Sequence, residues 1–125
     1  MSGKVLLVDD SSLARRSTRR LLEQAGYVVV EAEDGLGALE RFAIEKPDIV
    51  LLDLVMRGMY GLDVLMKLRE MDPAARVIVM SADIQTSSRD LVHAAGAAGF
   101  ITKPPAPGQV LEMVDRVMNG SAPWN

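Results

Sequence analysis

The chain has no cysteine, which excludes disulfides and thiol chemistry and is compatible with a reducing cytosol. Its single histidine, His93, is interpreted as a surface or packing residue and not as a ligand or base. No apolar stretch approaches the ~20 residues of a membrane span, so no membrane association is expected. With 14 basic and 17 acidic residues, the chain has no broad basic field, so direct binding to nucleic acid is not expected.

The remaining composition is that of an ordinary globular domain. The 125 residues are 49% hydrophobic and 25% charged, which is enough to form one domain with its own core. We expect this domain to cover residues 1–120, with residues 121–125 as a flexible C-terminal tail. Residues 1–4 lead straight into an apolar run without a signal peptide, which favours a cytoplasmic location.

Strand-like and helix-like segments alternate five times along the chain. The expected strands are Val5–Asp9, Val28–Ala32, Ile49–Asp53, Val77–Ser81 and Gly99–Thr102. The segments between and after them have apolar residues at helical spacing, with Leu13 and Leu22 in the first and Leu91 and Val92 turned inward in the fourth. Strict alternation of this kind predicts an α/β fold, a doubly wound parallel sheet with helices on both faces.

Two groups of charged residues are interpreted as solvated. Arg15, Arg16, Arg19 and Arg20 form a basic cluster that fits the exposed face of the first helix. The second strand ends in the mostly acidic segment 31–34, which fits a solvated turn. Neither group is expected to form part of a functional site.

Three acidic residues follow two apolar runs. Asp9 and Asp10 come directly after Val5–Val8, and Asp53 comes directly after Ile49–Leu52. Ligands of such sheets bind beyond the carboxyl ends of the strands, so these carboxylates are expected to converge there. A hard divalent cation would neutralise them, and Mg²⁺ is the usual ion when a phosphate is also involved, with Mn²⁺ as an alternative.

The fourth and fifth strands add a hydroxyl and an amine to the same edge. Ser81 ends one strand and Lys103 follows the other. A carboxylate can act as a nucleophile toward phosphorus, and metal and cationic groups can neutralise the phosphoryl oxygens. The set contains no histidine base and no arginine finger, which suits a protein that accepts and holds a phosphoryl group.

The same residues carry a family resemblance. The chain resembles the receiver domain of two-component response regulators, particularly the CheY-like single-domain (stand-alone) regulators. The matching segments are Val8–Ser11, Glu31–Gly35, Leu52–Met56, Met80–Ala82 and Phe100–Pro104. The resemblance implies a (βα)5 flavodoxin-like or CheY-like fold with strand order 2-1-3-4-5.

The resemblance also implies roles for individual residues. Asp53 corresponds to the phosphoacceptor, with Lys103 and Ser81 contacting the phosphoryl group. Asp9, Asp10, Asp53 and the backbone carbonyl of Val55 correspond to the metal ligands. Ser81 and Phe100 correspond to the switch pair, and Lys103–Pro104 to a cis peptide bond of the family.

The implied function is a phosphorylation-dependent switch of a two-component system. A histidine kinase or phosphotransfer protein would supply the phosphoryl group from a phosphohistidine. The altered surface of the fourth helix, fifth strand and fifth helix would then bind an unidentified effector protein, with chemotaxis as one candidate pathway. We expect a monomer or weak dimer that catalyses only its own phosphorylation and dephosphorylation and is not otherwise an enzyme.

Three other functions fit part of the same residue set. A phosphatase of the haloacid-dehalogenase type needs a second aspartate two residues after the nucleophile, where this chain has Val55. A flavodoxin-like cofactor carrier needs a phosphate-binding loop after the first strand, where Asp9 and Asp10 would repel a phosphate. A receiver that docks without phosphorylation is disfavoured by the complete set of acids, hydroxyl and lysine.

Overall fold

The structure is a computed structural model that describes residues 3–56, 58–82 and 85–120. The strands are β1 (Lys4–Val8), β2 (Val28–Ala32), β3 (Ile49–Asp53), β4 (Val77–Ser81) and β5 (Gly99–Thr102). The helices are α1 (Ser12–Gln24), α2 (Gly35–Glu45), α3 (Gly61–Met71), α4 (Thr86–Ala94) and α5 (Gln109–Met118). The tail expected at residues 121–125 lies outside the described residues.

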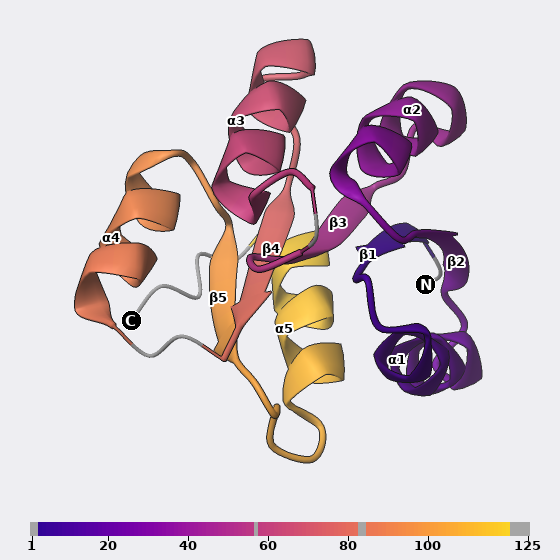
Figure 1. The fold of residues 1–125 in the computed structure, drawn as a ribbon. Helices are drawn as coiled ribbons and strands as arrows, with labels where there is room; N and C mark the ends of the chain where they lie inside the picture. The colour runs from indigo at the N-terminus through magenta and orange to yellow at the C-terminus, as the bar shows by residue number, and fades with distance from the viewer. Residues whose placement is uncertain (1–2, 57, 83–84, 121–125) are drawn as a thin grey trace.

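The five strands form one parallel sheet in the order β2-β1-β3-β4-β5. This confirms both the doubly wound α/β class and the strand order implied by the resemblance. Figure 1 shows α1 and α5 on one side of the sheet and α2, α3 and α4 on the other. Because β1 and β3 are neighbours, with Val8 opposite Leu52, the segments that follow them come close together.

Two hydrophobic cores lie on the two faces of the sheet, because successive side chains of a strand point to opposite faces. In β1, Leu6 and Val8 belong to the core with α2, α3 and α4, while Val5 and Leu7 belong to the core with α1 and α5. A strand covered on both faces needs apolar residues at every position. The apolar runs of the sequence are therefore explained by burial, and all five residues of β3 are buried.

Two leucines expected in the core are exposed. Leu13 is 71% exposed and Leu91 is 55% exposed, while Leu22 and Val92 are buried as expected. Each helical residue turns the side chain by about 100°, so Leu13 and Leu22, nine residues apart, point in opposite directions. Leu91 and Val92 are adjacent in α4, so their side chains point about 100° apart. Both errors came from the helical phase and not from the position of the helices.

Two elements, β1 and α4, also differ from the expected bounds by one residue at each end. β1 ends at Val8 and not at Asp9, although the Asp9 N–H still donates to the Ala32 carbonyl at 3.2 Å. α4 covers Thr86–Ala94 instead of starting at about Ser87 and ending at Ala95. The first difference places Asp9 just beyond the strand, where its side chain faces the carboxyl edge of the sheet.

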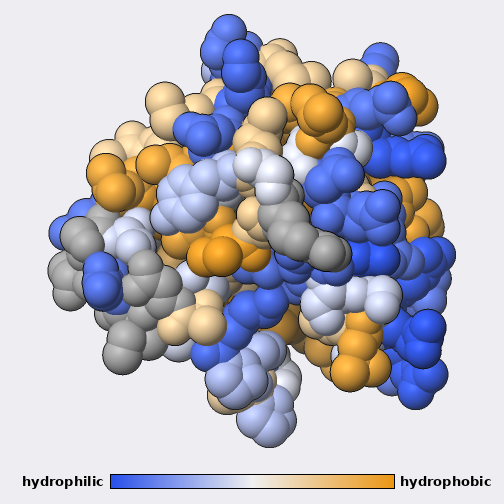
Figure 2. All heavy atoms as spheres, viewed as in Figure 1, coloured by the Kyte–Doolittle hydropathy of each residue, from blue (hydrophilic) through white to orange (hydrophobic). Residues whose placement is uncertain are grey.

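The surface over α1 and α2 is mostly hydrophilic, and Figure 2 shows its hydrophobic residues in separate patches. Exposed apolar side chains there include Leu13, Leu36 and Ile44. Within the described ranges, none of the helices is both long and apolar enough to cross a bilayer.

Candidate functional site

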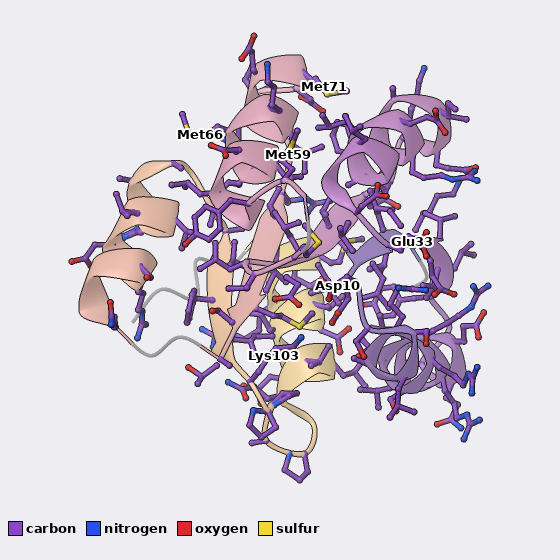
Figure 3. The ribbon with its side chains drawn as sticks, in the orientation of Figure 1. Asp10, Glu33, Met59, Met66, Met71 and Lys103 are labelled. Atoms are coloured by element: carbon purple, nitrogen blue, oxygen red, sulfur yellow. The ribbon has the colours of Figure 1, made fainter. Side chains whose placement is uncertain are left out.

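The three acidic residues predicted to converge do so at the carboxyl edge of the sheet. Asp9 and Asp10 follow β1 and Asp53 ends the neighbouring β3, so that one carboxylate oxygen of each lies within 4.8 Å of the others. Asp9 is 2% exposed and Asp53 is 7% exposed, so both carboxylates are largely removed from water. Figure 3 shows Asp10 near the centre of the view, with Lys103 on the neighbouring part of the same edge.

Lys103 bridges the two buried carboxylates from the end of β5. Its Nζ donates to Asp9 Oδ2 at 2.9 Å and to Asp53 Oδ2 at 3.2 Å. Burial alone would lower the pKa of Lys103, but the hydrogen bond to Asp9 and the charge of Asp53 outweigh it and raise the pKa. The ammonium therefore stays protonated at neutral pH and opposes part of the acidic charge.

The other oxygen of each buried carboxylate accepts a backbone N–H two residues further on. Ser11 N donates to Asp9 Oδ1 at 2.9 Å, and Val55 N donates to Asp53 Oδ1 at 3.2 Å. Ser11 also caps α1, because its Oγ accepts the N–H of Ala14. The helix cap is therefore Ser11 and not Asp10, which agrees with the interpretation of Asp10 as a member of the acidic cluster.

The loop after Asp53 is held close to the sheet by a glycine. Gly61 N donates to the Leu54 carbonyl at 2.8 Å, at the start of α3. A Cβ at position 61 would lie 2.6 Å from Leu54 Cα and 2.7 Å from the Asp53 carbonyl oxygen. Only a residue without a side chain allows this approach, which fixes where the segment carrying Val55 leaves the strand.

The electrostatics of the site favour a bound cation. Burial raises the pKa of Asp53, and repulsion from Asp9 adds to this effect while the Lys103 charge opposes it. One ammonium faces three carboxylates, so a further positive charge would relieve the repulsion. The oxygen separations are on the scale of the ~4 Å between opposite ligands of an octahedral Mg²⁺, and an all-oxygen donor set suits a hard divalent ion.

Ser81 and Phe100 lie where the resemblance places the switch pair, but their roles stay predictions. Ser81 ends β4 and is fully buried, and its register partner in β5 is Thr102. Phe100 is half-buried against the core shared with α2, α3 and α4. The guanidinium carbon of Arg89, on α4, lies 5.9 Å from the centre of its ring. The Lys103–Pro104 peptide bond is cis, as the resemblance implied.

The interpretation of the basic cluster as a solvated helix face was wrong for Arg15, whose side chain is 13% exposed, whereas the Arg19 side chain stays 40% exposed. Arg15 Nε contacts Glu31 Oε1 at 2.9 Å, and Arg19 Nη1 contacts Glu31 Oε2 at 2.5 Å. Arg15 also donates through Nη1 to the Asp9 carbonyl. One feature of the sequence could have indicated this contact. Glu31 lies two residues after Val29 in the strand, so both side chains point to the face of the sheet that packs against α1.

Comparison with known proteins agrees with the fold. The response regulator receiver domain family matches residues 5–115, and the chain belongs to this family. It is 38% identical to the chemotaxis protein CheY of Thermotoga maritima over 118 residues, covering 94% of this chain and 98% of that protein.

Two further relatives give the same result. The identity to chemotaxis protein CheY of Bacillus subtilis is 36%, covering 95% of this chain and all of that protein. The solved structure of chemotaxis protein CheY4 of Vibrio cholerae superimposes with a TM-score of 0.88 at 28% identity, covering 94% of this chain and 99% of that one. Membership of the receiver family sets aside the phosphatase and flavodoxin interpretations.

Proposed function

We propose that this receiver domain is a phosphorylation-dependent switch with Asp53 as the phosphoacceptor. The observation that carries the proposal is the double contact of Lys103 with Asp9 and Asp53, beside a third carboxylate from Asp10. This arrangement supports the proposal because the nearly buried carboxylate of Asp53, acting as nucleophile, would lie next to a positive charge and an acidic cluster able to hold a divalent cation.

The proposed reaction transfers a phosphoryl group from a phosphohistidine of a kinase or phosphotransfer protein. An oxygen of Asp53 forms a bond to phosphorus and the P–N bond breaks. The imidazole, protonated on its other ring nitrogen, leaves as the neutral ring with the electron pair of that bond. Asp9, Asp10, Asp53 and the Val55 carbonyl would hold Mg²⁺, or Mn²⁺ in its place. The metal would neutralise charge on the phosphoryl oxygens. Lys103 and Ser81 would contact the same oxygens from the other strands.

The product would alter the contacts of Lys103, because a phosphorylated Asp53 carries more negative charge than a carboxylate. Movement of Lys103 and Ser81 toward the phosphoryl group would shift the position of Phe100 and the surface of α4, β5 and α5. An effector protein would bind the conformation whose population phosphorylation increases. We propose chemotaxis as the first pathway to test, because relatives carry that name. A cytoplasmic location and a monomeric or weakly dimeric state stay predictions.

Intact-mass spectrometry after incubation with acetyl phosphate and Mg²⁺ tests the proposal. We expect the mass of one phosphoryl group on the wild type and on Asp63→Asn, whose altered carboxyl is exposed on α3. We expect no added mass on Asp53→Asn. Phosphorylation at another residue would refute the assignment. If neither acetyl phosphate nor beryllofluoride bound, the result would favour the receiver that docks without phosphorylation.

A further inference from the structure

Glu31, at the end of β2, is held by two arginines of α1. Each of its oxygens contacts a different arginine, Oε1 with Arg15 Nε at 2.9 Å and Oε2 with Arg19 Nη1 at 2.5 Å. The hydrogen bond from Arg19 is the main reason why the pKa of Glu31 is lowered, and Arg15 adds to the effect. The Arg15 side chain is 13% exposed, against 40% for Arg19, so Arg15 is the inner member of the pair.

Arg15 also contacts the backbone of the acidic cluster. Its Nη1 donates to the carbonyl oxygen of Asp9 at 2.5 Å, while the Asp9 N–H donates to the Ala32 carbonyl. That carbonyl belongs to the peptide bond that joins Asp9 to Asp10. Because a peptide unit is planar, fixing this oxygen fixes the plane from which the Asp10 side chain departs.

We infer that Arg15, oriented by Glu31, is a positioning residue for the divalent cation site. It orients the Asp9–Asp10 peptide so that both carboxylates reach the same point as Asp53. The inference rests on the proposed function, in which these three aspartates hold the cation. Groups that orient metal ligands commonly change metal affinity when they are removed, even though they do not touch the ion.

Ligand positioning and simple electrostatics predict opposite changes in metal affinity when Arg15 is removed. A guanidinium beside a cation site repels the cation, so its removal should strengthen binding if charge alone mattered. If Arg15 positions the ligands, its removal should weaken binding. The ion pair with Glu31 offsets the charge of Arg15, which makes the repulsive contribution smaller than the contribution of geometry.

The experiment measures Mg²⁺ affinity by calorimetry and Mn²⁺ affinity by electron paramagnetic resonance, on the unphosphorylated full chain. Arg15→Met keeps the apolar stem and removes the donors, and we expect roughly 10-fold weaker binding of both ions. Arg16→Met, the matched control, removes the same charge from the adjacent exposed position on α1, and we expect no weakening. Arg15→Lys keeps the charge but offers one ammonium in place of a fork, so partial weakening is expected.

A merely structural role would lower the melting temperature without changing the bound state. The Mn²⁺ spectrum of folded Arg15→Met should instead show altered coordination, and Glu31→Gln should weaken binding in the same direction. Equal or tighter Mg²⁺ binding by Arg15→Met overturns the inference while leaving the proposed function standing. If that variant does not fold, wild-type affinity in Arg15→Lys overturns it. A wild type that binds no Mg²⁺ refutes the proposed metal site itself, and the inference with it.

Discussion

Replacing Lys103 by methionine removes the ammonium that donates to both Asp9 and Asp53. Methionine keeps a flexible apolar stem of similar length, so the change is mainly one of charge and hydrogen bonding. Asp9 and Asp53 remain almost fully buried, and each still accepts one backbone N–H, from Ser11 and Val55 respectively. We therefore expect Lys103→Met to destabilise the metal-free fold.

The size of the effect follows from the two contacts, at 2.9 and 3.2 Å. Each attraction is worth roughly 5 kcal/mol at an effective dielectric constant of about 20, but the loss of lysine hydration offsets much of it. Removing one partner of a buried ion pair costs about 3–5 kcal/mol. The Lys103 side chain is 24% exposed, which favours the lower end, about 3 kcal/mol. For a domain of this size the melting temperature should fall by roughly 10 °C.

Urea unfolding followed by circular dichroism, first with a chelator and then with saturating Mg²⁺, measures the effect. The variant should gain more stability from Mg²⁺ than the wild type does, because the ion then neutralises carboxylates that have lost their lysine. Lys67→Met, on the exposed face of α3, is the control for losing one positive charge and should change stability by less than about 0.5 kcal/mol.

Two results would refute this reasoning. If Lys103→Met loses no more stability than Lys67→Met in the presence of chelator, the two contacts of Lys103 contribute no net stability. An equal gain from Mg²⁺ in variant and wild type would mean that the lysine and the metal do not neutralise the same carboxylates.

Three further predictions concern Asp53, Tyr27 and Gly61. Asp53→Asn should raise the free energy of unfolding at pH 7 without divalent ions, because the raised pKa of Asp53 shows that the fold disfavours its charged form. This gain should vanish below about pH 4, where Asp53 is protonated in both the folded and the unfolded state. Urea titrations at several pH values measure it. Burial and the hydrogen bond to Asp115 raise the pKa of Tyr27 to about 12, so stability should fall as pH rises through about 10 to 12, and Tyr27→Phe should abolish this part of the alkaline loss in thermal melts. Gly61→Ala should destabilise the fold by about 2 kcal/mol or more and weaken Mg²⁺ binding, because the new Cβ would press on the backbone of Leu54; wild-type values in calorimetry would contradict this.

The sheet could be predicted from sequence because burial on both faces leaves a simple pattern. The run Ile49–Leu52 has no polar residue, and the structure buries every one of its side chains. The convergence of Asp9, Asp10 and Asp53 could also be predicted, since it requires only that parallel strands end at one edge. The strand order could not be derived in this way and came from the resemblance.

Side-chain partners were harder to predict than elements. The apolar character of Leu13 does not reveal its helical phase, and a shift of half a turn moves it from the core to solvent. Similarly, a row of arginines looks solvated until the neighbouring strand is placed beside it. Arg15 is partly buried only because β2 brings Glu31 under α1, a contact between residues 16 apart in the chain.

The arrangement of Lys103 has a consequence for how the proposed switch would respond to the metal. In the unphosphorylated structure one ammonium is shared, with the shorter contact to Asp9 and the longer one to Asp53. A phosphoryl group on Asp53 would attract this ammonium more strongly, which would leave Asp9 buried with less compensation. A cation held by Asp9 and Asp10 would supply the missing charge. Metal binding should therefore lower the cost of moving Lys103, so that the ion supports the conformational response as well as the phosphoryl transfer.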